Sequence, residues 1–335
     1  MENKDMFDKE WEQELPPENE MKQIQRSIRR RSRKIIALSV AAAVVLLGLL
    51  TYGVIPLAER FFWNPSETTY GSHTDLETML HVYTDLFTPG YNVSYVNYRR
   101  SGFASYDLEV PVFSTAQRTE LSAAGALKKN ILSLDQNFFN PMNKHYPFPR
   151  HTTPNYVPSG MDVDALRQKL SQLPEYIRLE ATICFPEDLS MEELMEFRSY
   201  HSDLLITWVG VRSAETSEPL PPLMGMDPFT GGTVFDGFLM EYRHFDAKQI
   251  TEPAHLEKHF KTRLQYYMDQ LAKDRAFYRY TEDTLNKALA YVEENGVYTY
   301  GCVVTATPQV LLDLLDSGIA CTMDLVDCWI DIITK

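Results

Sequence analysis

The chain has 335 residues, 44% of them hydrophobic, and a formal net charge of −14 at pH 7. A strongly acidic chain is a poor match for nucleic acid, because phosphate binding needs clustered Lys and Arg. The charge is uneven, since residues 21–34 carry seven basic side chains and no acidic one, whereas residues 1–20 and 35–335 are both acidic.

The first 34 residues form a short tail with one apolar helix face. Phe7, Trp11 and Leu15 recur at intervals of four residues, which places them on one side of a helix. So short a helix is marginal by itself in water, so the face predicts a partner or the membrane surface. A disordered tail with incidental aromatic residues is the alternative. Residues 21–28 are expected to continue into the next helix.

Residues 35–58 form an uncharged, largely apolar run. As a helix it is roughly 36 Å long, enough to cross a hydrocarbon core of about 30 Å. A cleaved signal peptide has an apolar region of only about 7 to 15 residues. A buried helix of a soluble core is the other alternative, but it would not need a basic flank. We therefore predict an uncleaved membrane span.

Basic residues immediately before the span predict its orientation, because such residues mark the cytoplasmic side. The tail then lies in the cytoplasm, its basic cluster faces the anionic inner leaflet, and the rest of the chain lies outside. The aromatic residues 61–63 fit the outer interface. The orienting residues are Arg29, Arg30, Arg31, Arg33 and Lys34.

Residues 64–140 predict a first extracytoplasmic α+β region. Residues 64–73 are typical of a linker, and a helix is expected from about 75 to 87, ended by Pro89 and Gly90. Strands are expected at 91–98 and 106–113, followed by a helix over 119–132. The segment 140–160, rich in Pro, Asn and His, is the expected boundary with a second domain.

Residues 162–333 predict two β-α-β blocks. In the first, alternating apolar residues at 179–185 indicate a strand, Ser190 with Glu193 forms a capping box for a helix to about 200, and 204–211 is a second strand. In the second, a strand at 297–306 is followed by a helix capped by Thr307, with Pro308 as its first residue, and by a strand at 319–333.

The segment between the two blocks predicts a loop at 218–232, a strand at 234–242 and helices at about 253–274 and 282–295. The fold class is therefore α+β. Two such blocks sharing one sheet can form a ferredoxin-like layer, here with a helical insertion, although the order of strand pairing cannot be read from the sequence.

No motif in the sequence supports catalysis or a cofactor. His255 and His259 lie one helical turn apart, but Leu256 stands where the zinc motif HExxH needs its glutamate. No GxSxG, GxxxxGK[ST] or GxGxxG motif occurs. We therefore predict neither a metal, nor a cofactor, nor an enzyme.

Four cysteines lie late in the chain, each in an apolar, strand-like run. They are Cys184, Cys302, Cys321 and Cys328. Outside the membrane an even number permits disulfides, but a chain this long does not depend on them. Small buried hydrophobic residues are the favoured interpretation, and the sequence leaves their redox state open.

The order of features resembles the membrane-bound sigma-factor regulators of Gram-positive bacteria, which have N-terminal and C-terminal regulator domains. The resemblance is carried by the span with residues 24–113, and by the runs CFPEDLSMEELMEF (184–197), LLITWVGV (204–211) and YGCVVTATPQVLLDLL (300–315). It implies an anti-sigma factor whose outer domain senses an envelope condition and whose tail acts on an extracytoplasmic-function sigma factor. The tail departs from zinc-containing anti-sigma domains in lacking His and paired Cys.

Two alternatives stay open. One is a membrane protein that binds an envelope ligand without sigma-factor contact, which predicts a pocket in the outer part. The other is an envelope hydrolase, which requires His255, His259 or a cluster of carboxylates to line a cleft.

Overall fold

The computed structural model describes residues 18–330, apart from 71–72, 94, 118, 142–143, 153–162, 216–221, 229–251, 274, 276 and 278. The tail residues Phe7, Trp11 and Leu15 and the strand predicted at 234–242 lie outside the described residues. The chain divides into two compact units, Met1–Phe61 and Phe62–Lys335.

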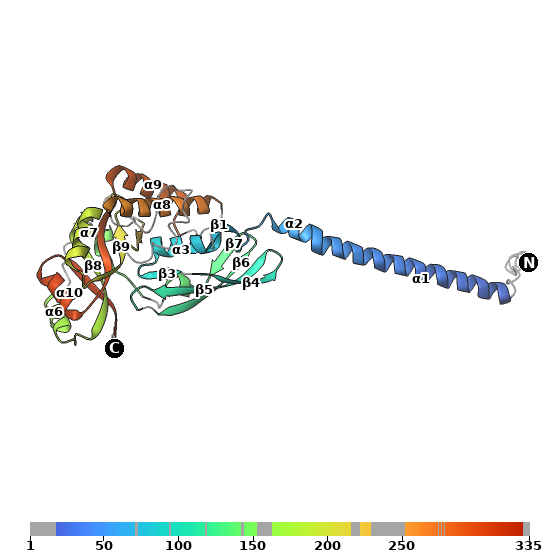
Figure 1. The fold of residues 1–335 in the computed structure, drawn as a ribbon, viewed down its shortest axis with the longest axis horizontal. Coiled ribbons are helices and arrows are strands. Elements are labelled where there is room, and N and C mark those ends of the chain that lie inside the picture. Colours follow the sequence, from blue (N-terminus) through green and yellow to red (C-terminus); the bar gives the residue numbers. More distant parts are fainter. Residues whose placement is uncertain are drawn as a thin grey trace, which may run out of the picture. The chain divides into compact units, whose positions relative to one another are not determined.

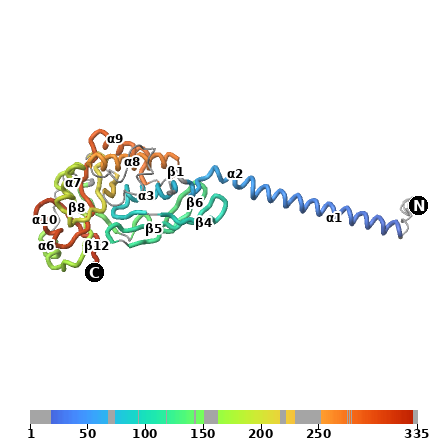
Figure 2. The backbone as a smooth tube through the Cα atoms, in the orientation of Figure 1, coloured from blue at the N-terminus to red at the C-terminus, as the bar shows by residue number. Residues whose placement is uncertain are grey.

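The described part of the first unit is one long helix. It comprises α1 (Glu18–Leu49), the π-helical turn η1 (Leu50–Val54) and α2 (Ile55–Glu59), as Figures 1 and 2 show in blue. Pro56 has no backbone N–H, so the helix cannot keep its regular hydrogen bonding there, and the π-turn lies directly before it. Residues Asn19–Glu59 are long and apolar enough to cross a membrane, with a mean hydropathy of 2.5 in their most apolar window.

The central helix of the second unit is α3 (Asp75–Phe87), which follows the short strands β1 (Thr68–Tyr70) and β2 (His73–Thr74) in the predicted linker. The Thr74 hydroxyl accepts a hydrogen bond from the Glu77 N–H, and the Glu77 carboxylate accepts one from the Thr74 N–H. This capping box fixes the predicted start of the helix. Nearly all its residues are buried, polar ones included, so α3 lies inside the unit rather than on its surface.

The first large sheet is antiparallel. Its strands are β3 (Tyr91–Val93), β4 (Asn97–Gly102), β5 (Ser105–Ser114), β6 (Glu120–Lys128) and β7 (Ile131–Leu134), in the order β3-β5-β6-β7 with β4 also paired to β5. The helix predicted over 119–132 is wrong. Along β6 the larger side chains of Leu121 and Leu127 alternate with exposed residues at a period of two, and Ala and Gly fill the positions between. The predicted strand 91–98 is two strands, β3 and β4.

The second large sheet confirms both predicted β-α-β blocks. Its strand order is β10-β9-β11-β8-β12, with every neighbouring pair antiparallel. The first block is β8 (Ile177–Ser190), α7 (Met191–Tyr200) and β9 (Leu205–Val211), and the second is β11 (Tyr298–Ala306), α10 (Pro308–Asp316) and β12 (Thr322–Ile330). Strand β11 lies between β8 and β9, so the blocks interleave as in a ferredoxin-like sheet.

The remaining elements cover or extend these sheets. They are α4 (Gln136–Phe139), α5 (Pro149–Thr152), α6 (Val163–Ser171), β10 (Gly225–Met226), α8 (Pro253–Ala272) and α9 (Glu282–Asn295). Strand β10 was not expected, since it lies within the predicted loop 218–232. The predicted caps Ser190 and Thr307 accept a hydrogen bond from the first turn of their helices, as does Thr281 before α9.

One hydrophobic core runs through both sheets of the second unit. It includes Trp63, which is 1% exposed, so the prediction that Trp63 lies at the outer membrane interface is wrong. The core also contains α3 and α8, which pack together. Residues of both predicted regions, 64–140 and 162–333, contribute to this core. Their division into separate domains stays a prediction.

A buried ion pair joins α3 to α8. The Asp85 carboxylate pairs with the Arg263 guanidinium and lies 3.3 Å from His259 Nε2, and it accepts a hydrogen bond of 2.6 Å from the Asp227 N–H. Burial raises the pKa of Asp85, but the charges of Arg263 and His259 more than offset it, so the pKa lies well below its usual range. The residue therefore holds α3 to α8 as an anion.

We predict that Asp85→Asn lowers the free energy of unfolding by about 3–5 kcal/mol, because the buried Arg263 loses its counter-charge. Asp164→Asn is the control, since its pair with Arg167 is exposed and is worth about 0–1 kcal/mol. Denaturant unfolding followed by tryptophan fluorescence measures both. Equal losses in the two variants would contradict this account.

A second prediction concerns how the free energy of unfolding depends on pH. Folding lowers the pKa of Asp85 from its ordinary 3.8, so its contribution to stability is fully present above pH of about 4 and is lost as the pH falls below that value. The same unfolding measurement between pH 6 and pH 3 is expected to show a weaker acid dependence in Asp85→Asn than in the wild-type chain. Parallel pH profiles would show that Asp85 is not the linked group.

Candidate functional site

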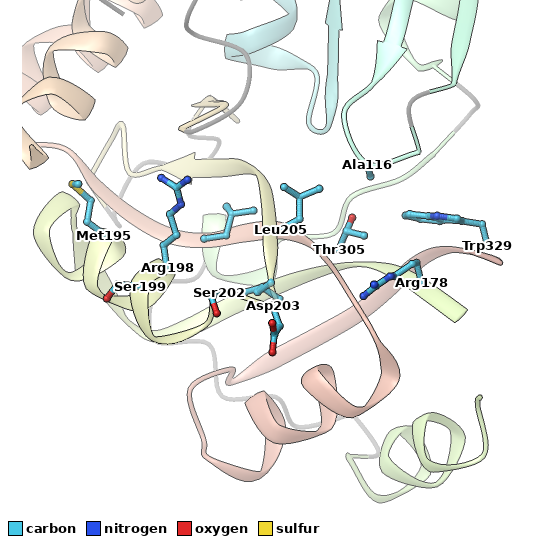
Figure 3. A pocket seen from close by; sticks show the side chains of 12 residues that line it. Ala116, Arg178, Met195, Arg198, Ser199, Ser202, Asp203, Leu205, Thr305 and Trp329 are labelled. Atoms are coloured by element: carbon cyan, nitrogen blue, oxygen red, sulfur yellow. The ribbon is translucent and has the colours of Figure 1, made fainter. Parts of the chain in front are cut away.

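A hollow of about 710 Å³ lies over one end of the second sheet. Its lining comes from widely separated parts of the chain, namely the β5–β6 loop, β8, α7, the α7–β9 loop, β9, β11 and β12. Figure 3 shows Ala116 above the strands that carry Leu205, Thr305 and Trp329. Such a hollow is large enough for a small molecule or part of a chain.

The hollow combines an open strand edge with basic side chains. Strand β10 pairs with β9 only at Val209 and Gly210, so among the described residues no strand pairs with the outer edge of β9 at 205–207. Arg178 and Arg198 line the hollow with one acidic residue, Asp203. The lining is therefore locally basic in a unit that is acidic overall.

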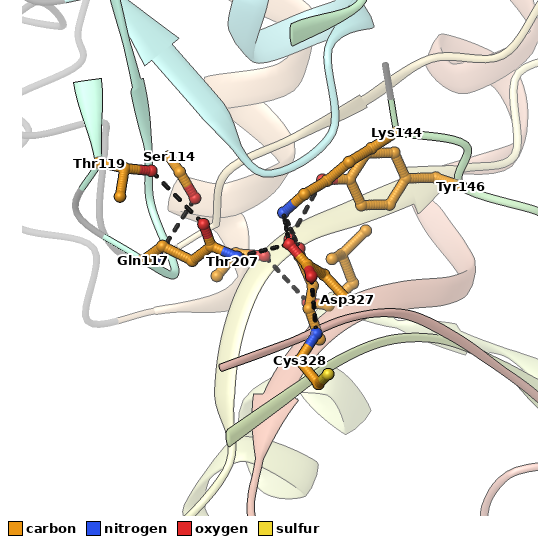
Figure 4. Close-up of polar contacts among 10 residues, drawn as sticks. Ser114, Gln117, Thr119, Lys144, Tyr146, Thr207, Asp327 and Cys328 are labelled. Atoms are coloured by element: carbon orange, nitrogen blue, oxygen red, sulfur yellow. Dashed lines mark hydrogen bonds and ion pairs between the residues drawn. The ribbon is translucent and has the colours of Figure 1, made fainter. Parts of the chain in front are cut away.

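A buried ionic cluster adjoins the hollow (Figure 4). Lys144 Nζ lies 2.6 Å from Glu180 Oε2 and 2.9 Å from Asp327 Oδ2. The Tyr146 hydroxyl donates to Glu180 Oε1 at 3.1 Å, and Gln117 Nε2 donates to Asp327 Oδ2 at 2.6 Å. These residues tie the β5–β6 loop and the segment before α5 to strands β8 and β12.

The cluster and the hollow share one face of the sheet. Glu180 lies two residues after Arg178 on β8, and Asp327 lies two residues before Trp329 on β12. Side chains two apart on a strand point to the same face. Ala116, which lines the hollow, precedes Gln117 of the cluster. A ligand that displaced side chains in the hollow would therefore act on residues next to the ionic cluster.

The cluster holds its groups in fixed charge states. Burial lowers the pKa of Lys144, but the hydrogen bond and charge of Glu180 more than offset it, so the pKa is raised. Burial raises the pKa of Asp327, and Lys144 more than reverses this, so that pKa is lowered. Burial and the neighbouring Glu180 charge raise the pKa of Tyr146, so its hydroxyl stays protonated and donates. The cluster thus combines two carboxylates with one cation.

The predicted membrane-orienting residues all lie on α1 and are exposed. They are Arg29, Arg30, Arg31, Arg33 and Lys34. The predicted partner-binding residues Phe7, Trp11 and Leu15 lie outside the described part of the chain. No motif or spacing in the sequence indicated Lys144, Glu180 or Asp327, which lie on three separate segments.

His259 and two of the four cysteines are buried in the second unit. His259 is fully buried beside Asp85. Within the described residues, no group of three or more His, Cys, Asp or Glu is placed to hold a metal ion. All four cysteines are free thiols. Cys184 and Cys302 are buried as predicted, but Cys321 is only partly buried and Cys328 is exposed, so the prediction of a buried residue is wrong for Cys328.

Residues 170–319 match a family described as sigma factor regulator C-terminal. These residues therefore form a domain similar to the C-terminal domain of sigma factor regulators. No curated protein and no solved structure matches the chain. The match falls inside the C-terminal region predicted at 162–333, and the assignment of 64–140 to the N-terminal region of such regulators stays a prediction.

The regulator domain supplies most of the hollow. Arg178, the residues of α7 and β9, and Thr305 lie within the matched residues, whereas Ala116 and Trp329 lie outside them. The ionic cluster likewise joins Glu180 of the regulator domain to Lys144 and Asp327 beyond its matched limits. The hollow is therefore completed by elements that flank the domain.

We predict that Lys144→Met lowers the free energy of unfolding by about 3–5 kcal/mol, because Glu180 is fully buried and loses its counter-ion. The control is Lys287→Met, which breaks an exposed pair with Asp283 and costs about 0–1 kcal/mol. Urea unfolding of the detergent-solubilised chain measures the difference. A cost for Lys144→Met no larger than that of the control would show that the cluster does not stabilise the fold.

Proposed function

We propose that this sigma factor regulator is a single-pass membrane protein of the anti-sigma type that acts without catalysis. Residues 35–58 cross the bilayer, residues 62–335 lie outside and respond to an envelope condition, and residues 1–34 contact an extracytoplasmic-function sigma factor in the cytoplasm. The observation that carries the proposal is the combination, in one chain, of a regulator domain with a separate helical unit long and apolar enough to span a membrane.

The proposed orientation is supported by the distribution of charge. Seven basic side chains lie between residues 21 and 34, directly before the apolar run, and basic residues beside a span favour the cytoplasmic side. The regulator domain follows the span, so this orientation places it outside. A signal then has to pass through one helix.

The tail provides a small but specific contact surface in this proposal. Residues 1–34 are too few to form a domain with its own core. Phe7, Trp11 and Leu15 supply one apolar face that can fold against a groove of the sigma factor, as amphipathic helices commonly do. Two aromatic side chains on such a face are typical binding hot spots.

Co-purification from cells tests the proposal. The tagged full chain is expected to retain an extracytoplasmic-function sigma factor from solubilised membranes, and Phe7→Ala/Trp11→Ala is expected to reduce the retained amount at least about tenfold. Lys9→Ala/Gln13→Ala, on the opposite side of the same helix, is the matched control and is expected to retain it. If the wild-type chain retains no sigma factor, the anti-sigma proposal fails.

The hollow favours a second candidate, a membrane protein that binds an anionic envelope ligand without sigma-factor contact. Arg178 and Arg198 beside an open strand edge are the observation in its favour. This candidate requires that a ligand binding in the hollow stabilises the outer unit against unfolding. It also requires that the protein functions without residues 1–34. Retention of a sigma factor by the wild-type chain, lost in Phe7→Ala/Trp11→Ala, would exclude it as the whole function.

A further inference from the structure

Two turns at one end of the first sheet form a basic surface on a second unit that is acidic overall. The β4–β5 turn carries Phe103 and the β6–β7 turn carries Lys128 and Lys129. The turns lie side by side, because Ser105 pairs in register with Lys128 and the Lys129 N–H donates to the Ala104 carbonyl at 2.6 Å. Figure 1 shows β4, β6 and β7 at one end of this unit and α6 and α10 at the other.

We call this surface the basic tip and define it by its exposed residues. They are Arg99, Arg100, Phe103, Lys128, Lys129 and Ile131. Phe103 is 45% and Ile131 is 73% exposed. No acidic residue occurs in 97–106 or 121–134. The nearest acidic residue on β5 is Asp107, which pairs in register with Arg99, so the basic tip keeps a positive balance within an acidic unit.

The chain itself keeps the basic tip close to the end of the apolar helix. The helix ends at Glu59, and the ring of Phe62 packs edge-on against Phe103 with centroids 5.7 Å apart. The Trp63 N–H donates to Asn130 Oδ1 at 2.8 Å, which fixes the chain to the second turn. Three residues of extended chain reach at most about 11 Å. Wherever the helix leaves the bilayer, both turns lie near that point.

We infer that the basic tip rests on the outer leaflet of the membrane and binds anionic phospholipid headgroups. The inference depends on the membrane anchor of the proposed function. Lys and Arg near an anionic surface gain electrostatic energy within about one Debye length, and exposed aromatic and aliphatic side chains favour the interfacial layer. This contact makes the basic tip a second point of attachment beside the helix, so it fixes the tilt of the outer unit over the bilayer.

Photo-crosslinking of the full chain in proteoliposomes tests the inference. Phe103→p-benzoylphenylalanine is expected to form lipid adducts in vesicles that contain phosphatidylglycerol. Tyr200→p-benzoylphenylalanine is the control, since Tyr200 is 81% exposed but lies on α7, away from the basic tip. Because both leaflets have the same composition, the orientation of insertion does not matter. Equal adduct yields at 103 and 200 would overturn the inference.

A charge variant tests the headgroup contact. Arg99→Gln/Lys128→Gln/Lys129→Gln is expected to lower the adduct yield at 103 by about fivefold for each charge removed, whereas Lys169→Gln/Lys273→Gln/Lys287→Gln leaves it unchanged. Arg100 is kept because its Nε donates to the Gly102 carbonyl at 3.3 Å. An unchanged yield in the first variant would show that anionic headgroups are not the partner.

A separate measurement distinguishes a wrong membrane anchor from a wrong lipid contact at the basic tip. Alkaline extraction of the same proteoliposomes is expected to leave the chain in the membrane pellet. A chain that is released overturns both the anchor and the basic tip contact. A chain that stays in the pellet without adducts at 103 overturns only the contact.

Discussion

The second unit depends on two buried carboxylates, Asp85 and Glu180. A charge inside a protein is costly unless oppositely charged or hydrogen-bonding groups surround it. Asp85 finds Arg263 and His259 on α8, and Glu180 finds Lys144 and Tyr146 on the segment before α5. These partners reach the carboxylates only when both sheets and α3 occupy their observed positions. The two buried ion pairs therefore favour one packing of the core, which hydrophobic contacts alone would specify less well.

Local signals in the sequence predicted much of the fold. Capping residues and period-two alternation identified α3, α7 and α10 with their flanking strands, because those elements are determined by nearby residues. The strands β6 and β7 were missed, since an Ala-rich stretch has high helix propensity and its strand pairing with β5 comes from tertiary structure. The burial of Trp63 was likewise not visible, because its partner Asn130 lies on a distant turn.

The candidate site was less predictable than the fold. The alternative function predicted a pocket, but no motif located it, because the hollow is assembled from the β5–β6 loop and from four strands that are adjacent only after folding. Its arginines are ordinary strand and helix residues in the sequence. The ionic cluster was missed for the same reason, since Lys144 and Asp327 are separated by most of the second unit.

Together these features suggest how an outer unit on a single helix can respond to its surroundings. The hollow and the ionic cluster occupy one face of the second sheet. The basic tip lies on the first sheet, at the turns β4–β5 and β6–β7. In the proposed function, a ligand in the hollow acts on a second unit whose elements are tied by buried charges, and its effect reaches the first unit through the chain that joins the two. This proposal requires the second unit and the tail to lie on opposite sides of the membrane.

That requirement is tested most directly by labelling cysteines with a membrane-impermeant maleimide. Cys328 is exposed, while Cys184 and Cys302 are buried, and burial raises the pKa of both thiols, which makes them unreactive. Cys321 is partly exposed, so it is replaced by Ser throughout. We predict that intact cells label the Cys321→Ser chain but not Cys321→Ser/Cys328→Ser, and that Ser27→Cys in the latter chain is labelled only after permeabilisation. Labelling of Ser27→Cys in intact cells, with Cys328 protected until lysis, would contradict the account.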